Sequence, residues 1–177
     1  MNIRPAVLED VTQIAAVHIL GWQDEYRDLL PRAVLNRLSE PDPMSRWYAM
    51  VQQSEWPGRG VLVADRGGTV AGFATIRPTS DQDQDPGRVG EIAALYVHPR
   101  AWRRGVGRSL VAAATGRLAA AGRVSATLWV LETNSRAIAL YEAGGFVPDG
   151  AVKPGFVSGV TTHNVRYQRP LVHPGPR

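Results

Sequence analysis

The segment from residue 91 to residue 121 constrains the fold more than any other part of the chain. Residues 91–97 have the composition of a strand, and a turn that begins with proline follows at 99–105. Apolar residues then recur with helical spacing over 106–121, and Gly122 follows them directly, where helices commonly end. The segment therefore predicts a strand, a glycine turn and a helix that packs on a sheet.

Hydrophobic spacing predicts the remaining elements in the same way. Strands are expected at residues 2–6, 61–64, 70–76, 125–131, 146–153 and 162–169, and helices at 8–22, 44–53, 134–143 and from Pro31 to the prolines at 41 and 43. The polar stretch 78–90 is expected to be a loop. This order predicts an α+β fold with helices on the faces of a sheet, in a single domain over residues 1–170 with a flexible tail at 171–177.

Charge is divided unevenly between the two halves of the chain. Residues 1–91 carry 13 acids and 9 bases, whereas residues 92–177 carry 3 acids and 11 bases. Six arginines and no acid lie between residues 92 and 131, so this stretch should attract an anionic ligand. A nucleic-acid-binding protein is one alternative, but the aromatic residues lie mostly outside the basic half and do not alternate with its arginines.

Gly105 and Gly107 open the expected helix at 106–121. Glycine lets backbone N–H groups approach a ligand closely, and the first turn of a helix has N–H groups without internal partners. Such a turn binds phosphate. Leu110 stands where a dinucleotide fingerprint or a P-loop needs glycine, which disfavours both of those classes. A turn that only caps the helix is the simpler structural alternative.

With its neighbouring residues, this turn resembles the acetyl-CoA-binding core motif of the GNAT N-acetyltransferase superfamily. The resemblance comprises residues 91–97, Pro99 and residues 103–110, which read Arg-Arg-Gly-Val-Gly-Arg-Ser-Leu. A second signature runs from Asn134 through Tyr141 to the Gly-Gly-Phe at 144–146. The opening residues Ile3-Arg4-Pro5-Ala6, with Glu9-Asp10, are also typical of the family. Trp102 departs from the pattern, because that position often holds Gln or Arg.

The resemblance implies a fold and a cofactor site. The fold is a GNAT-like mixed, mostly antiparallel sheet of about seven strands with helices on both faces, splayed between its two central strands. The pantetheine arm of acetyl-CoA would lie in that gap and its diphosphate at the glycine turn. The cofactor-binding residues implied are Leu95, Tyr96, Val97, Arg103, Arg104, Gly105, Val106, Gly107, Arg108, Ser109, Asn134 and Tyr141.

The resemblance also implies catalytic and acceptor-binding residues. Tyr141 matches the family tyrosine that acts as general acid at the coenzyme sulfur. Glu91 is the candidate general base, and its family counterpart often contacts the acceptor; a strand-end salt bridge is the alternative interpretation. Trp22 and Tyr26 are candidates for the acceptor pocket, although such aromatic residues more often belong to a core. The acids at 24, 25 and 28 would attract a cationic acceptor, or simply lie on a charged helix surface.

The predicted function is acetyl-CoA-dependent N-acetyl transfer to a small-molecule or peptide amine. The chain has no cysteine to carry an acyl group, which favours direct transfer in a ternary complex. A non-catalytic acyl-CoA-binding module or sensor is the alternative. Four scattered histidines and no cysteine disfavour a metal centre. Without a signal segment or apolar span, we expect a cytoplasmic protein with no membrane or nucleic-acid partner, either monomeric or, as is common in the family, homodimeric.

Overall fold

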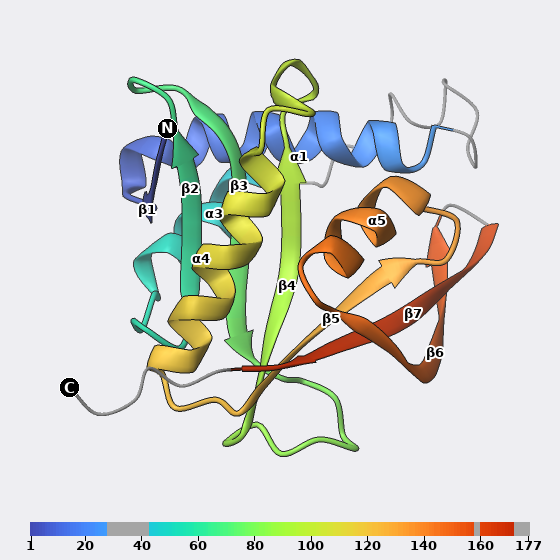
Figure 1. Ribbon diagram of the computed structural model, residues 1–177. Helices are drawn as coiled ribbons and strands as arrows, with labels where there is room; N and C mark the ends of the chain where they lie inside the picture. The colour runs from blue at the N-terminus through green and yellow to red at the C-terminus, as the bar shows by residue number, and fades with distance from the viewer. Residues whose placement is uncertain (28–42, 158–159, 172–177) are drawn as a thin grey trace.

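The described part of the chain is built around one seven-stranded mixed sheet, in the order β1-β2-β3-β4-β5-β7-β6 (Figure 1). The computed structural model describes residues 1–27, 43–157 and 160–171. Its strands are β1 (Asn2–Pro5), β2 (Gly60–Asp65), β3 (Val70–Pro78), β4 (Val89–Val97), β5 (Ser125–Leu131), β6 (Val147–Val157) and β7 (Val160–Pro170). Only β4 and β5 run parallel among these neighbouring pairs, so the predicted mixed, mostly antiparallel sheet is confirmed.

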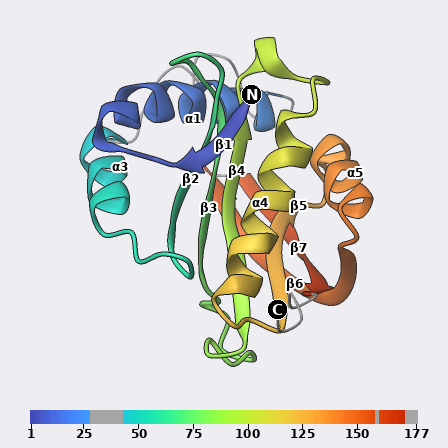
Figure 2. The same cartoon turned by 60° about the vertical axis from the view of Figure 1, so that its left-hand side comes forward.

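Helices cover both faces of this sheet, as predicted. Helices α1 (Val11–Glu25) and α3 (Pro43–Gln52) lie on one face, and α4 (Val106–Ala120) and α5 (Ser135–Ala143) lie on the other (Figure 2). Each face has its own core, with Trp47 and Phe73 on the α1 side and Leu110, Leu118 and Phe146 on the α4 side. The helix expected to begin at Pro31 and most of the expected tail lie outside the described residues. None of the described helices is long and apolar enough to span a membrane.

The N-terminal residues are joined to the sheet and to α1 through Arg4. Its guanidinium donates hydrogen bonds to both carboxylate oxygens of Asp10, at 2.7 and 3.0 Å, and to Asp65 at 3.0 Å. The hydrogen bonds from Arg4 are the main reason that the pKa of Asp10 lies below its ordinary value. The typical opening residues of the sequence are therefore a structural device that ties β1, the start of α1 and β2 together.

The last hairpin is longer than the sequence pattern predicts. The sequence predicts strands at 146–153 and 162–169, and the residues that follow the first of them, Pro154 and Gly155, are uncommon inside strands. In the structure, β6 continues to Val157 and Pro154 pairs with His163 on β7. Strand β6 forms one edge of the sheet. A proline is tolerated there, because one side of an edge strand needs no hydrogen-bond donor.

The two central strands separate along their length. Strands β4 and β5 pair at only three positions, the last of which joins Glu91 to Thr127. The register between β3 and β4 then shifts, which leaves Ala93 without a partner on β3. An extra residue of this kind bends a strand and increases its twist. Strand β4 therefore diverges from β5 beyond Glu91, and the predicted splay is confirmed.

Candidate functional site

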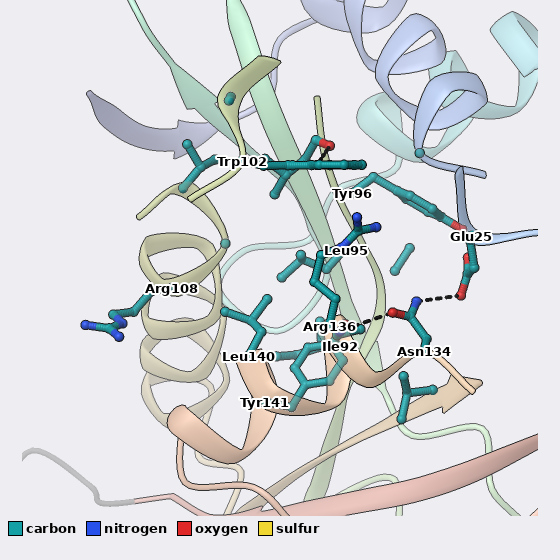
Figure 3. A pocket seen from close by; sticks show the side chains of 18 of the residues that line it. Glu25, Ile92, Leu95, Tyr96, Trp102, Arg108, Asn134, Arg136, Leu140 and Tyr141 are labelled. Carbon is teal, nitrogen blue, oxygen red and sulfur yellow. Dashed lines mark hydrogen bonds between the residues drawn. The ribbon is translucent and has the colours of Figure 1, made fainter. Parts of the chain in front are cut away.

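A cavity of about 870 Å³ lies where β4 and β5 have separated (Figure 3). Its walls come from the end of α1, residues 92–97 of β4, the turn before α4, the first turn of α4, part of β5 and the start of α5. Residues of α1, β4, α4, β5 and α5 thus meet at one place. The splay creates this space, because paired strands would leave no room between them.

Strand β4 presents unpaired backbone groups to this cavity. The N–H of His98 donates to Ala71 on β3, and backbone groups on a strand alternate between its two sides. The N–H and C=O groups of Leu95 and Val97 therefore point away from β3, into the gap. The carbonyl of Val97 already accepts a hydrogen bond of 2.8 Å from the indole Nε1 of Trp102. Such an edge can pair with an extended ligand that carries amide groups.

The first turn of α4 closes one end of the cavity. The N–H of Ser109 donates to the Gly105 carbonyl at 3.0 Å, which is the first bond of the helix. The N–H groups of residues 105–108 therefore have no helical partner. Arg103, Arg104 and Arg108 are exposed beside them, and none of the ion pairs among the described residues involves these three arginines. Free N–H groups, the helix dipole and three arginines together favour a phosphate-bearing ligand.

Backbone conformation at this turn leads to a stability prediction. Gly105 has φ +78°, in the left-handed region, and a Cβ there would meet no atom within 4 Å. Gly105→Ala should therefore cost only the conformational penalty, about 1–2 kcal/mol of unfolding free energy. Gly116 in the same helix is equally open but has ordinary helical geometry, so Gly116→Ala should stabilise by about 0.5–1 kcal/mol. Urea denaturation of both variants measures this; effects of the same sign would contradict the prediction.

Trp102 and Arg136 stack on each other at the wall of the cavity. The guanidinium of Arg136 is 3.8 Å from the centre of the Trp102 ring (Figure 3). It also forms an ion pair with Asp24 at the end of α1. The indole is held by its bond to Val97. Trp102, the departure from the family pattern, thus holds neither a charge nor an amide toward the glycine turn. It supplies instead a flat wall and a stacking partner for an arginine of α5.

Helix α5 brings two of the predicted residues to the cavity. Asn134 caps the helix by accepting a hydrogen bond of 3.0 Å from the N–H of Ala137. Tyr141 lies two turns later, with its ring edge-to-face against Phe146 at 6.2 Å. Burial raises the pKa of Tyr141 above its ordinary value. The Tyr141 hydroxyl is therefore protonated throughout the neutral range.

Most of the predicted cofactor-binding residues line this cavity. They are Leu95, Tyr96, Val97, Arg103, Gly105, Val106, Gly107, Arg108, Asn134 and Tyr141. Arg104 and Ser109 lie in the same turn but are not among the lining residues. The two aromatic candidates for the acceptor pocket, Trp22 and Tyr26, pack against each other with ring centres 4.6 Å apart and do not line the cavity either.

Glu91 lies just beyond the cavity, at the last position where β4 and β5 pair. Its carboxylate accepts hydrogen bonds from Arg77, at 2.9 and 3.3 Å, and from Ser80 at 3.3 Å. Glu91 is only 4% exposed, and it is not one of the residues that line the cavity. Its negative charge is thus balanced by the Arg77 guanidinium.

The cavity contains one carboxylate among its described lining residues, and it is Glu25 rather than Glu91. Burial is the main cause that raises the pKa of Glu25 above its ordinary value. The sequence marks Glu25 only as one of several acids near the end of a helix. Nothing in local spacing distinguishes it, because its environment is formed by residues of β4 and α5.

Comparisons with known proteins agree with this geometry. Residues 21–146 match the model of the acetyltransferase (GNAT) family. The chain is 32% identical over 167 residues to an uncharacterized N-acetyltransferase, YuaI, of Bacillus subtilis (strain 168), covering 93% of this chain and 90% of that protein. It is 36% identical over 110 residues to a mycothiol acetyltransferase of Sanguibacter keddieii; the match covers 62% of this chain but only 34% of that longer protein. The PaiA N-acetyltransferase of Thermoplasma acidophilum, solved in complex with coenzyme A, is similar with a TM-score of 0.77 at 16% identity, over 96% of this chain and 98% of that one.

Proposed function

Because the chain belongs to the acetyltransferase (GNAT) family, we propose that it moves an acetyl group from acetyl-CoA to a primary amine of a small molecule or peptide. The observation that carries this proposal is the splay of β4 from β5, which ends at the first turn of α4. An unpaired strand edge and a phosphate-binding turn at one cavity suit a ligand with two amides and a diphosphate. Coenzyme A has that chemistry, and the Thermoplasma neighbour of the same fold holds it.

The residues of the cavity fit acetyl-CoA, which supplies an acetyl group activated as a thioester. The N–H groups of residues 105–108 would hold the diphosphate, with charge added by Arg103, Arg104 and Arg108. The backbone of Leu95 and Val97 would bind the amides of the pantetheine arm. Asn134, at the start of α5, would contact the same arm. A backbone N–H of β4 near the thioester would stabilise the negative charge that develops on the carbonyl oxygen.

Tyr141 is the proposed donor to the sulfur that leaves. A thiol has a pKa near 8.5 and an ordinary tyrosine near 10, so full proton transfer to the thiolate is uphill by about 2 kcal/mol. Burial raises the pKa of Tyr141 further, which makes that transfer less favourable. Tyr141 therefore acts mainly by donating a hydrogen bond to the sulfur as negative charge develops on it.

The amine must lose a proton before it can attack. An alkyl amine has a pKa near 10 and is almost fully protonated at neutral pH, so a base is needed. Glu91, the acid that the sequence favours, and Glu25, which lines the cavity, are the two candidates. The chain offers no cysteine for a covalent acyl intermediate, which supports direct transfer within a ternary complex.

Release of free thiol from acetyl-CoA tests this proposal. The purified chain should release free coenzyme A thiol from acetyl-CoA with at least one class of amine. The classes to test are polyamines, amino acids, antibiotics that carry an amino group, peptides and lysine-containing proteins. A mass increase of the amine by one acetyl group identifies the product. Tight binding of coenzyme A without thiol release from any class would favour the non-catalytic binding module instead. If the chain neither binds coenzyme A nor releases thiol, both the acetyltransferase and the binding-module interpretations are contradicted.

A further inference from the structure

Glu25 occupies an unusual position for a carboxylate at the end of a helix. It is the last residue of α1, yet its side chain turns into the cavity between β4 and α5 (Figure 3). Asn134 Nδ2 donates to its Oε1 at 3.5 Å, and the Tyr96 hydroxyl points toward the same carboxylate (Figure 3). None of the ion pairs in the described ranges 1–27, 43–157 and 160–171 involves Glu25.

Two contacts hold this end of α1 in place. Gly21 lets α1 approach β4, because a Cβ there would lie 2.5 Å from the ring of Tyr96. Asp24 is paired with Arg136 of α5, which in turn stacks on Trp102. The position of the Glu25 carboxylate is thus set by contacts with β4 and α5 rather than by solvent.

The surroundings of Glu25 are short of positive charge. The titratable or charged side chains that face it are Asp24 and Tyr26 from α1, Tyr96 from β4, and Arg136 and Tyr141 from α5. Arg136 is already paired with Asp24. Burial, together with the charge of Glu25, raises the pKa of Tyr26 to about 12, so that this phenol stays neutral. A partly buried carboxylate among neutral phenols attracts a cation more strongly than a solvated one does.

We propose that Glu25 binds the protonated amine of the acceptor, a primary alkylammonium group, and takes its proton before acetyl transfer. Glu91 is less suited to this task, because Arg77 already balances its charge and it does not line the cavity. Asn134 acts as a positioning residue, since it donates a hydrogen bond to the carboxylate, and Tyr96 lies beside it in the same cavity. This proposal rests on the proposed acetyltransferase function and assigns the amine side of that site.

The protons and bonds of this step balance. The ammonium group gives one proton to the Glu25 carboxylate, which becomes a neutral acid. The freed lone pair of nitrogen forms the C–N bond to the acetyl carbonyl carbon as the C–S bond breaks. Nitrogen loses its second proton in the process, and the sulfur gains one, assisted by the hydrogen bond from Tyr141. Glu25 then returns its proton to solvent after the amide leaves.

Two acceptors of different charge test the role of Glu25. One is the best alkylamine found by thiol release with the wild-type protein, and the other is methoxyamine, whose amino group is uncharged at neutral pH. Glu25→Gln should lower kcat/KM for the alkylamine by about 100-fold at neutral pH, the usual effect of losing a general base. It should change the rate with methoxyamine little. With the alkylamine, the rate of the variant should climb with pH as neutral amine forms, and approach the wild-type rate.

The pH profile of the wild-type protein gives a second measurement. The carboxylate is the active form, so kcat/KM falls as pH is lowered through the pKa of Glu25. Because burial raises that pKa, the fall should begin above the range of an ordinary glutamate, near 4.3. The inflection at that pKa should be absent in Glu25→Gln, whose rate falls with pH only because less of the amine is neutral. Glu25→Asp, which keeps a carboxylate, should retain part of the rate, and Glu55→Gln, which removes an exposed acid, should match wild type.

Stability separates a catalytic role from a structural one. A carboxylate with a raised pKa is less favourable in the folded state than a neutral group, so Glu25→Gln should unfold at the same temperature as wild type or higher. Equal losses with both acceptors, or a wild-type rate in Glu25→Gln with the alkylamine, would overturn the proposal. The same pattern in Glu91→Gln instead would assign the base to Glu91. No thiol release by the wild-type protein with any amine would instead refute the proposed function itself.

Discussion

Arg166→Ala should lower the free energy of unfolding by about 3–5 kcal/mol, which is the usual cost of removing one partner from a buried ion pair. The Arg166 side chain is only 7% exposed. Its guanidinium contacts three carboxylates, Asp149 at 2.7 Å, Asp81 at 3.1 Å and Asp83 at 2.6 Å. Asp149 and Asp81 are themselves 7% and 12% exposed. The variant would leave two poorly solvated negative charges without their cation.

The consequence should extend from stability to the cavity. Asp81 also accepts hydrogen bonds of 3.1 and 3.0 Å from the indole Nε1 of Trp129, and Trp129 lines the cavity. Arg166 therefore connects the segment that follows β3 to β7 and, through Asp81, to the wall of the site. The intrinsic fluorescence of Trp129 should therefore change in the variant, because the surroundings of its indole change.

Urea denaturation measures the loss, and a second arginine provides the matched control. Arg59 is 54% exposed and lies 4.0 Å from Glu55, an exposed pair, so Arg59→Ala should cost less than about 1 kcal/mol. Arg166→Met, which keeps much of the apolar stem, should still be strongly destabilised, since the aspartates remain unpaired. A cost for Arg166→Ala no larger than that for Arg59→Ala would show that water solvates these aspartates adequately.

Elements whose signals are local could be predicted from the sequence with accurate bounds. Strand β5 was expected at 125–131 and is observed there, and the helix expected at 106–121 is α4, Val106–Ala120. Asn134 was expected to cap α5 and does so. These features depend on periodicity, on glycine and on a capping side chain, all of which act within a few residues. The helix expected from Pro31 remains a prediction.

Features that depend on distant contacts could not be predicted in this way. The polar residues of 78–90 indicate a solvated loop, yet Asp81 and Asp83 are anchored by an arginine more than eighty positions later in the chain. The same limit applies to the two acids of the site. The sequence favours Glu91 as the general base and presents Glu25 only as one of three acids that would attract a cationic acceptor. Only the fold shows that Arg77 neutralises Glu91 while Glu25 lines the cavity. The hydrophobic periodicity of a sequence does not predict which charged side chains form ion pairs in the folded protein.

Tyr141→Phe should lower kcat by about 100-fold, because it removes the one hydroxyl proposed to donate a hydrogen bond to the departing sulfur. The Phe ring should keep the packing of Tyr141 against Phe146, so the unfolding temperature and the Kd for coenzyme A should change little. The protonated form of Tyr141 persists to high pH, since burial raises its pKa. The variant should therefore show the wild-type pH profile at a uniformly lower rate.

A second buried tyrosine separates this effect from a general loss of packing. Tyr167 on β7 is 6% exposed, and its hydroxyl lies 3.3 Å from Glu142, outside the cavity lining. Tyr167→Phe should keep the wild-type kcat. A wild-type rate in Tyr141→Phe would remove Tyr141 from the chemistry, and a changed alkaline limb would mean that Tyr141 transfers its proton outright. The hydrogen-bond role requires both a lower rate and an unchanged profile, because a phenol whose pKa is raised by burial is a poor acid but remains a good donor.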